Sequence, residues 1–482
     1  MNCRRWAAAM AILLLAALVR LWGLGAQSLW MDEAFSHLFA RLPLDVAWQA
    51  MIVDAVHPPL YYLLLRPWLA LAGESEFALR LPSAAAGVLT VALIFRVGRA
   101  WANRQTAVWS ALLLAVSPFH VWYSQEARMY ALLGLLALGV LWSFWLTLRS
   151  DRLAVWGALA ALSALAYVVH YFALCLPLIE FVFLSATFRR YHQLVICWTL
   201  VQALAALPLA AWLVGLYSIG GGTFGIGWIP SPRLDELLKT LWSFGMAYDG
   251  HVTLLVVVVA LIGCGLLVTG LVCRNGQREA RVFLLLALAL PPIVTFLLSL
   301  RRPTYVDRFF IGSLPAFLLL ATLGLPRLLR LAQLVACLVL VGVGLLGVIR
   351  FHYDPFFTKE AWRDVAAFVQ AHERAGDALA LRYFQFVVPF RYYYHGALEL
   401  ETVTFNQQTA SLEELVAGHD RLWLVMRSSH TDPHHLAWSK PFESDREEQE
   451  PTVRMWMAEH SPADTFSFPG VMVMLFDARD KP

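Results

Sequence analysis

The sequence predicts a mainly α-helical, polytopic membrane protein that ends in a soluble α/β domain. Its 482 residues are 59% hydrophobic and 15% charged, with a mean hydropathy of +0.61, whereas average soluble domains are about 25% charged. The charge balance also shifts along the chain. Residues 1–350 contain 25 of the 37 Lys and Arg residues but only 14 of the 34 Asp and Glu residues. We therefore expect a basic transmembrane domain over 1–350 and an acidic soluble domain over 351–482.

Eleven stretches are long and apolar enough to cross a membrane, which takes about 20 residues. The first follows a short basic region, and Arg20 and Trp22 stand where a cleaved signal peptide would have small residues. We therefore expect it to be an uncleaved spanning helix. The predicted spans, about 11 with a range of 11 to 13, are 6–24, 79–98, 105–121, 128–148, 153–169, 171–188, 194–217, 251–273, 282–300, 309–326 and 331–349.

The distribution of Lys and Arg predicts the orientation, because these residues favour cytoplasmic loops. With eleven spans, every basic cluster falls on one side of the membrane, and these clusters are Arg4–Arg5, Arg96–Arg99–Arg104, Arg149–Arg152, Arg189–Arg190, Arg274–Arg278–Arg281 and Arg327–Arg330. The loops around 25–78, 122–127, 218–250 and 301–308 fall on the other side, together with residues 351–482. This pattern predicts a multi-pass protein of the cell (inner) membrane whose C-terminal domain is extracytoplasmic.

The first outer loop is expected to contain interfacial helices. Residues 57–73 are apolar but short, and counting them as a span would place all later basic clusters outside. A helix lying in the interface and opened by Pro58 and Pro59 fits better. Residues 34–52 mix apolar and polar residues and are expected to lie there too. Around 218–250 we expect a Gly- and Pro-rich loop that includes a short helix in DELLKTLWSF.

The C-terminal region mixes helix and strand signals. Residues 358–373 have helical periodicity, with Thr358 as the expected N-terminal cap. DALALRY, LELETVTF and DRLWLVMR have the composition of strands. The alternation predicts a small α/β domain.

Ionisable residues lie at the outer ends of several spans, where such groups are costly and therefore candidates for function. Acids and arginines from separate loops are expected at one level of the membrane, where they could form a water-filled site that holds an anion against carboxylates. These residues are Asp32, Glu33, His57, Glu126, Arg128, His170, Arg301, Arg302, Asp307 and Arg308.

Simpler interpretations of the same residues stay open. The arginines of RRPTYVDRFF could extend to the interface from a helix end, and Glu126 and Arg128 could form an ordinary loop pair. For His170 a packed, hydrogen-bonded histidine is favoured over a ligand. Asp32 and Glu33 could be solvated residues at a helix end, although two adjacent acids repel each other.

Several site types find no support in the sequence. The six cysteines lie in or beside apolar runs without CxxC spacing, so they are expected in helices rather than in disulfides or metal sites. In HTDPHH (430–435) a solvated loop is favoured over a metal site, because a proline interrupts any helix. Neither a phosphate-binding GxxxxGK[ST] loop nor a basic stripe is present, which argues against nucleotide and nucleic-acid partners.

Four short motifs resemble those of a known superfamily. WMDEAFS, HPPLYYLLLRPW, ESEFALRLPSAAAG and YSQEARMYALL, in this order, are similar to polyprenyl-phosphate-sugar-dependent glycosyltransferases of the GT-C superfamily. The similar group includes the protein O-mannosyltransferases of glycosyltransferase family 39 and the lipid A aminoarabinose transferases. The resemblance covers most of residues 15–325. It implies a GT-C fold and an inverting transfer of a sugar from a polyprenyl phosphate to an acceptor hydroxyl at the outer face, with a cell-envelope glycan, lipid or protein as acceptor.

The resemblance also implies roles for the acids. Asp32, in the first outer loop, would be the general base at the catalytic centre. Glu33 would support Asp32 or contact the acceptor, and Glu126 lies where relatives have a further acidic residue in the second outer loop.

Basic residues are implied at the donor phosphate. Arg128 matches the family's arginine in its motif, and His57 and Arg308 are candidates to hold the phosphate. Aminoarabinose transferases tend to have Glu-Lys before the two prolines where this chain has Val56-His57, which argues against their zinc site and against their sugar here. No metal ligands are assigned, and a divalent cation cofactor is left open. A secondary transporter or lipid flippase is the alternative, although no internal repeat is visible and the charges lie at helix ends rather than at the midplane.

Overall fold

The computed structural model describes residues 3–220, 229–246, 254–272, 278–382, 384–402, 409–428 and 456–477. The chain divides into two compact units. The first contains Met1–Leu24 and Phe39–Ile349, and the second contains Gly25–Leu38 and Arg350–Pro482. A short segment from near the N-terminus thus belongs with the C-terminal residues.

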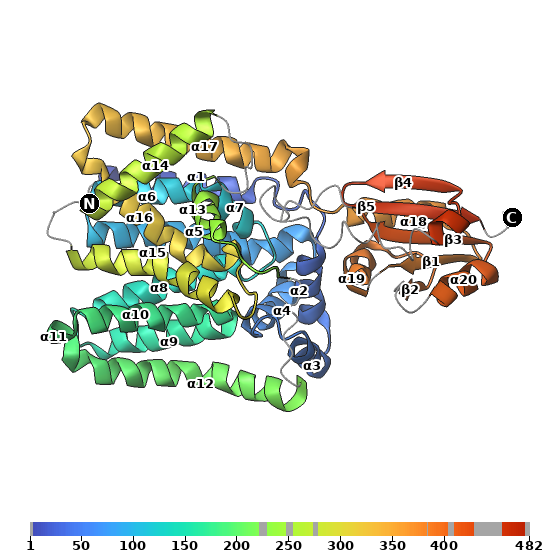
Figure 1. Ribbon diagram of the computed structural model, residues 1–482, viewed down its shortest axis with the longest axis horizontal. Helices are drawn as coiled ribbons and strands as arrows, with labels where there is room; N and C mark the ends of the chain where they lie inside the picture. The colour runs from blue at the N-terminus through green and yellow to red at the C-terminus, as the bar shows by residue number, and fades with distance from the viewer. Residues whose placement is uncertain are drawn as a thin grey trace. The chain divides into compact units, whose positions relative to one another are not determined.

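The first unit is a bundle of apolar helices, as the sequence predicted, and Figure 1 shows many of them running alongside one another. Each of the eleven predicted spans coincides with a helix or with consecutive helices. Six helices are long and apolar enough to cross a membrane, the bent pair α6–α7 would be a seventh, and the remaining spans correspond to shorter apolar helices in the described residues. The helices are α1 (Cys3–Leu21), α5 (Glu76–Trp101), α6 (Arg104–Ala115), α7 (Pro118–Ser124), α8 (Tyr130–Thr147), α9 (Leu153–Val169), α10 (Cys175–Ala186), α12 (Val195–Gly220), α14 (Leu254–Val272), α15 (Arg278–Ser299), α16 (Leu314–Leu323) and α17 (Arg330–Tyr353).

The third predicted span is bent by 58° between α6 and α7. Pro118 opens α7 and Ser117 caps it by accepting a hydrogen bond from the His120 N–H, so a new helix starts here. The bend leaves carbonyls of α6 unpaired within their own helix. The fully buried Arg20 of α1 donates to the Leu114 and Ala115 carbonyl oxygens at 3.1 and 3.0 Å. Arg20 therefore stabilises the bend from a neighbouring helix.

The segment between α1 and α5 forms three further helices, in agreement with the helical character predicted for it. They are α2 (Met31–Arg41), α3 (Leu44–Asp54) and α4 (Leu60–Ala72). With 13 residues, α4 is about 20 Å long at 1.5 Å per residue. That length is short of a hydrocarbon core of about 30 Å, and the interfacial position of α4 stays a prediction. The helix predicted in DELLKTLWSF is present as α13 (Asp235–Met246), and the Gly- and Pro-rich residues 221–228 lie outside the described residues.

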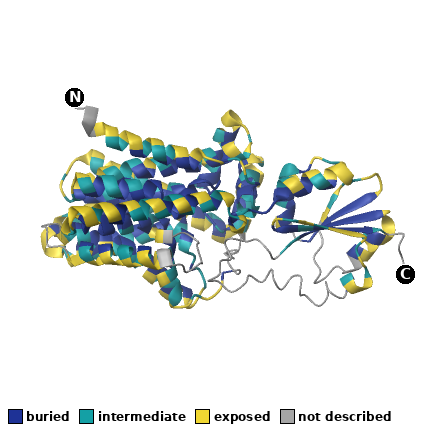
Figure 2. Cartoon of the chain, turned by 90° about the horizontal axis from the view of Figure 1, so that it is seen from above, coloured by how far each residue is buried: buried dark blue, intermediate teal, exposed yellow. Residues whose placement is uncertain are grey.

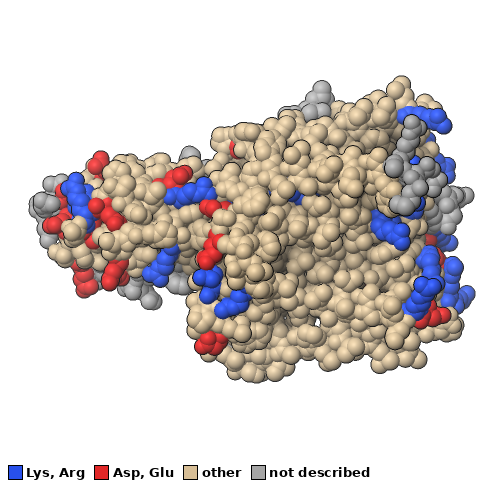
Figure 3. Space-filling view, turned by 180° about the vertical axis from the view of Figure 1, so that it is seen from behind, with Lys and Arg blue, Asp and Glu red and all other residues tan. Residues whose placement is uncertain are grey.

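Few charged side chains lie along the helices on one face of the helical unit (Figure 3). On the face shown in Figure 3, charged side chains gather at the two ends of the unit, with most Lys and Arg at one of them, and the surface along the helices is nearly free of charge. Large apolar side chains are exposed on this unit, among them Leu14, Leu18, Leu153, Ile196 and Leu200. Such a surface suits lipid as its solvent.

The second unit contains a five-stranded mixed sheet of strand order β2-β1-β3-β5-β4. The strands are β1 (Asp377–Leu381), β2 (Leu400–Thr402), β3 (Arg421–Arg427), β4 (Asp464–Phe468) and β5 (Val471–Asp477). β1 pairs in parallel with β2 and β3, and β5 pairs antiparallel with β3 and β4. The first three strands confirm the sequence prediction, whereas β4 and β5 were not predicted.

Helices cover both faces of this sheet. Residues of α18 (Trp362–His372) and α19 (Phe384–Tyr393) pack with one face, and residues of α20 (Thr409–Gly418) pack with the other. Among the central strands, β1 is buried throughout and β3 in all but its last residue (Figure 2), which explains their continuous apolar runs. The prediction of Thr358 as the helix cap was wrong, because α18 begins at Trp362 and the Ala361 N–H donates to the Pro469 carbonyl instead. That bond keeps the residues before α18 out of the helix.

Candidate functional site

His57 lies in the short loop between α3 and α4, in a conformation imposed by its neighbours. Ala55 ends α3 with a φ of 53°, a left-handed conformation that is uncommon for a residue with a side chain. His57 precedes Pro58, and a following proline disfavours helical backbone. The imidazole is 4% exposed. Local sequence therefore restricts the backbone on both sides of His57.

Arg128 approaches His57 from the loop between α7 and α8. Its Nη2 lies 3.4 Å from His57 Nδ1, and its carbonyl oxygen accepts a hydrogen bond from Ser83 Oγ at 3.0 Å. Glu126 of the same loop is buried, and its Oε1 accepts a hydrogen bond from Trp122 Nε1 at 2.8 Å. The loop is thus held by buried polar contacts rather than by solvent.

The ring of Tyr130, the first residue of α8, is the common neighbour of four basic groups. The guanidinium carbons of Arg308 and Arg128 lie 5.5 and 6.0 Å from its centroid. The rings of His170 and His57 lie 6.0 and 6.3 Å from it. The two imidazoles are 5.0 Å apart. All four basic side chains are buried, and we call His57, Arg128, His170 and Arg308 the basic cluster.

Electrostatics keeps both histidines of the basic cluster neutral. Burial lowers the pKa of His57 well below its usual value of 6.5, and Arg128, His170 and Arg308 lower it further. Burial, followed by the charges of Arg128 and Arg308, lowers the pKa of His170 to about 3. The cluster therefore carries two permanent positive charges at neutral pH, both on guanidinium groups.

The neighbouring arginines of RRPTYVDRFF differ from Arg308. Arg301 and Arg302 are exposed, so a solvated position at a helix end suits them, as the simpler interpretation had it. Arg308 lies in the 3-10 turn Asp307–Ser313 and is buried beside Tyr130. This contact separates Arg308 from the other two arginines, which the sequence alone could not do.

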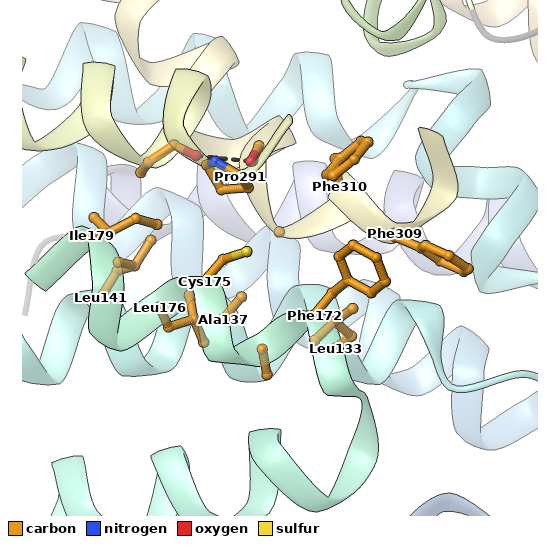
Figure 4. Close-up of a pocket in the computed structure, with 14 residues that line it drawn as sticks. Leu133, Ala137, Leu141, Phe172, Cys175, Leu176, Ile179, Pro291, Phe309 and Phe310 are labelled. Carbon is orange, nitrogen blue, oxygen red and sulfur yellow. Dashed lines mark hydrogen bonds between the residues drawn. The ribbon is translucent and has the colours of Figure 1, made fainter. Parts of the chain in front are cut away.

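A small apolar cavity of about 30 Å³ adjoins the basic cluster. Phe172 and Phe309 line it, and their rings lie 5.6 and 4.9 Å from the ring of His170. Figure 4 shows these two rings toward one end of the cavity, and Leu141 and Ile179 at the other. A polar, cationic site thus continues into an apolar space among α8, α10 and α15.

Asp32 and Glu33 belong to the second unit, in the first turn of α2. The N-terminus of a helix favours negative charge. Glu33 stands three residues after Trp30, and its Oε2 accepts from the Trp30 N–H at 3.4 Å, which is one half of a capping box. Asp32 is half-buried. The start of α2 therefore accounts for two adjacent acids.

Glu33 is also paired with a residue of the C-terminal region. Its fully buried carboxylate lies 3.0 Å from Lys359 Nζ. Next to Lys359, Glu360 forms an ion pair at 2.9 Å with Arg427, which ends β3. The start of α2 with Asp32 and Glu33, here called the acidic segment, is thereby held at the carboxyl end of β3 by two consecutive ion pairs.

The structure brings together three of the six predicted site residues, namely His57, Arg128 and Arg308. Glu126 lies in the same loop as Arg128, while Asp32 and Glu33 lie in the other unit. Sequence reasoning noted His170 but favoured a packed residue, and it missed Tyr130 and Lys359. Tyr130 stands in the quoted motif YSQEARMYALL, whereas nothing near Lys359 in the sequence signals its pairing.

No metal site is visible in the part of the chain that the structure describes. Within those residues, no group of three or more His, Cys, Asp or Glu side chains could hold a metal ion. The histidines of HTDPHH lie outside the described residues.

Comparisons with known proteins place this geometry in context. Residues 56–214 match the family model described as dolichyl-phosphate-mannose-protein mannosyltransferase. ArnT from Cupriavidus metallidurans bound to undecaprenyl phosphate is 14% identical, with 98% of each chain covered and a TM-score of 0.62. The same protein in the apo state is 13% identical, with 100% of each chain covered and a TM-score of 0.64.

A second similar structure is the archaeal oligosaccharyltransferase AglB from Archaeoglobus fulgidus, in complex with an inhibitory peptide and a dolichol-phosphate. It is 12% identical, with 100% of this chain and 75% of that chain covered and a TM-score of 0.55. No curated protein matches this chain significantly in sequence. The matched family segment contains His57, Glu126, Arg128 and His170.

Proposed function

We propose that this chain, which has the GT-C glycosyltransferase fold that its motifs predicted, is an inverting glycosyltransferase. It would move a sugar from a polyprenyl-phosphate donor to a hydroxyl group of an acceptor. The acceptor would be a glycan, lipid or protein of the cell envelope.

The observation that supports this proposal most is the basic cluster beside an apolar cavity. Two arginines and two neutral imidazoles surround one tyrosine ring, and Phe172 and Phe309 connect this cluster to the cavity. A lipid phosphate has the matching chemistry, because its head group is an anion and its chain is apolar. The undecaprenyl phosphate and the dolichol-phosphate named for ArnT and AglB are ligands of this type.

The leaving group explains the use of arginine. As the glycosidic bond breaks, a phosphodiester becomes a phosphomonoester and negative charge grows on the phosphate. Arg128 and Arg308 would stabilise that charge, because guanidinium groups bind phosphate through several charge-assisted hydrogen bonds. His57 would donate a further hydrogen bond. The buried positions of all three suit this role, since electrostatic interactions strengthen away from water.

Asp32 would act as the general base. Its carboxylate would take the proton of the acceptor hydroxyl while the hydroxyl oxygen attacks the anomeric carbon of the sugar. The bond from that carbon to the phosphate oxygen breaks, its electron pair leaves with the polyprenyl phosphate, and the anomeric centre inverts. Glu126 would stabilise positive charge on the sugar ring, as carboxylates do in glycoside hydrolysis. Glu33 would support Asp32 through its capping bond and its ion pair with Lys359.

The chain would work at the outer face of a cell membrane. The basic loops gather on one side of the predicted spans, and cytoplasmic loops favour Lys and Arg. A lipid-linked donor also fits a protein without a recognisable nucleotide-binding motif. In this arrangement residues 351–482 would be extracytoplasmic.

The donor site can be tested with purified protein, radiolabelled polyprenyl-phosphate sugars and a pair of arginine variants. Arg308→Ala should lower donor affinity or turnover about 10- to 150-fold, because a charge-assisted hydrogen bond contributes about 1.5–3 kcal/mol. Arg301→Ala is the matched control, since Arg301 is exposed in the same motif, and should behave as wild type. Arg128→Lys should recover little activity, because an ammonium group cannot replace a guanidinium fork. Equal behaviour of the Arg308 and Arg301 variants would remove the phosphate site from this cluster.

Cys175 offers an independent probe of the cavity that it lines. With the other five cysteines replaced, undecaprenyl phosphate should slow alkylation of Cys175 by an apolar maleimide, and inorganic phosphate should not. Unchanged alkylation would place the lipid chain elsewhere. A transporter or flippase would bind the lipid but release no acceptor product, so sugar transfer distinguishes the enzyme from that alternative.

A further inference from the structure

The two histidines of the basic cluster have defined tautomers. Arg128 Nη2 can only donate, so His57 Nδ1 must accept the contact at 3.4 Å. The Phe172 N–H donates to His170 Nδ1 at 3.2 Å. In each neutral ring the remaining proton must then lie on Nε2. Both histidines therefore offer an Nε2–H donor of fixed position.

These two donors have no recipient in the described protein. Neither His57 Nε2 nor His170 Nε2 has a hydrogen-bond partner among the described residues, although both atoms are buried. A buried donor without an acceptor costs about 1–3 kcal/mol, so two of them 5.0 Å apart by their ring centroids indicate a missing acceptor. The group that fits beside two guanidinium ions is an anion.

We propose that His170, together with His57, donates a neutral Nε2–H hydrogen bond to the phosphate of the polyprenyl donor, so that His170 is a fourth member of the phosphate site. This inference rests on the proposed function and adds a residue to it. The arginines and the histidines would have different roles, because only the arginines are charged. Arg128 and Arg308 supply two positive charges, which match the two negative charges that the phosphate carries after it has left the sugar as a phosphomonoester, above a second pKa of about 6. The imidazoles add directed donors without adding charge.

The position of His170 also links the head group to the lipid chain. Its ring lies 4.9 Å from Phe309 and 5.6 Å from Phe172, and both phenylalanines line the apolar cavity. His170 is the C-terminal cap residue of α9, and its ring accepts a hydrogen bond from the Phe172 N–H of the following 3-10 turn. A phosphate bound at Nε2 would therefore have apolar side chains directly beside it.

Binding measurements on the purified full chain test the inference with undecaprenyl phosphate as probe. Undecaprenol, which has the same chain without phosphate, is the control ligand. His170→Phe preserves an aromatic ring against Phe309 but removes the N–H, and should weaken undecaprenyl phosphate binding about 10- to 150-fold. His170→Gln places an amide N–H near the position of Nε2 and should recover most of the affinity. Undecaprenol binding should be the same in all variants.

A control variant and a spectroscopic measurement secure the interpretation. His372→Phe replaces an exposed histidine that also lies against a phenylalanine, and should leave binding unchanged. In ¹⁵N-histidine-labelled wild-type protein, the His170 ring should show the Nε2–H tautomer, and its Nε2–H signal should shift on addition of undecaprenyl phosphate. This second measurement decides the question even where a substitution prevents folding.

The possible failures differ from one another. If wild-type protein prefers undecaprenyl phosphate over undecaprenol while His170→Phe binds normally and the Nε2–H signal does not shift, His170 is a packing residue and the inference is overturned, but the proposed function stands. If wild-type protein binds both lipids equally, the phosphate site itself is absent and both proposals fail.

Discussion

Replacing Lys359 by Met is expected to destabilise the acidic segment strongly. Lys359 Nζ lies 3.0 Å from Glu33 Oε2, and the side chains of Lys359 and Glu33 are only 4% and 0% exposed. At this distance and an effective dielectric constant of about 20, the attraction amounts to about 5.5 kcal/mol. Removing one partner of a buried ion pair typically costs about 3–5 kcal/mol, because the other charge stays buried without compensation. We expect a loss of that size in Lys359→Met.

Hydrogen exchange of the α2 amides measures this loss locally. A destabilisation of about 3 kcal/mol or more should raise the exchange of protected α2 amides by about 100-fold or more. Arg41→Met is the matched control, because Arg41 ends the same helix in an ion pair whose side chains are 53% and 41% exposed. Exposed pairs contribute about 1 kcal/mol at most, so this variant should exchange much like wild type.

The double variant Glu33→Gln, Lys359→Met distinguishes a structural role of Glu33 from a direct role in sugar transfer. Removing both charges should restore most of the stability, since the penalty arises from one unpaired buried charge. If Glu33 only supports Asp32, sugar transfer should recover along with stability. A stable but inactive double variant would instead assign Glu33 a direct chemical role.

The reasoning would be refuted by equal effects of Lys359→Met and Arg41→Met on α2 exchange. In that case the buried pair does not hold the acidic segment, and the role of the C-terminal unit in supporting Asp32 would have to be abandoned.

Three further outcomes are expected. Asp32→Asn should fold and bind donor, but its turnover should be about 10²- to 10⁴-fold lower, the usual contribution of a general base. Asp45→Asn, at an exposed position in the first turn of α3, should keep normal turnover. Normal turnover of purified Asp32→Asn would end the assignment of Asp32 as the base. For topology, Glu413→Cys should be labelled by an impermeant maleimide in intact cells and Arg152→Cys only after lysis, and the reverse result would invert the predicted orientation. The pKa of His57 is lowered in the folded protein, so the unfolded state binds an extra proton below pH 6.5. This proton should lower the free energy of unfolding by up to about 1.4 kcal/mol for each pH unit of acidification. His57→Asn should reduce the pH dependence of the unfolding midpoint, and an unchanged slope would contradict this prediction.

The sequence determined the elements of the first unit because their signals are local. A run of apolar residues forms a helix in lipid wherever it occurs, since backbone groups must be paired within the segment. The eleven predicted spans therefore coincide with helices. The bend between α6 and α7 had a local cause in Pro118, but its stabilisation by Arg20 is a contact across more than ninety residues.

In the second unit, the same distinction applies to β1, β3 and β4, but not to β5, whose apolar and largely buried run was also missed. Residues 377–383 and 420–427 have continuous apolar patterns and were predicted, because β1 and β3 are covered on both faces. β4 is half exposed and pairs only with β5 at the edge of the sheet. Its pairing, rather than its composition, makes it a strand.

For the candidate site, the sequence by itself determined which residue types were available and which loops carried them. Motifs in separate segments identified Asp32, His57, Arg128 and Arg308 as candidates. Only the tertiary structure decided which of these side chains meet: it buried Arg308 beside Tyr130 and left Arg301 in solvent. It also brought His170 to His57 and Lys359 to Glu33. The physical reason is that hydrogen bonds and ion pairs act over a few ångströms in space, across 113 and 326 positions of sequence here, and no local pattern records such a contact.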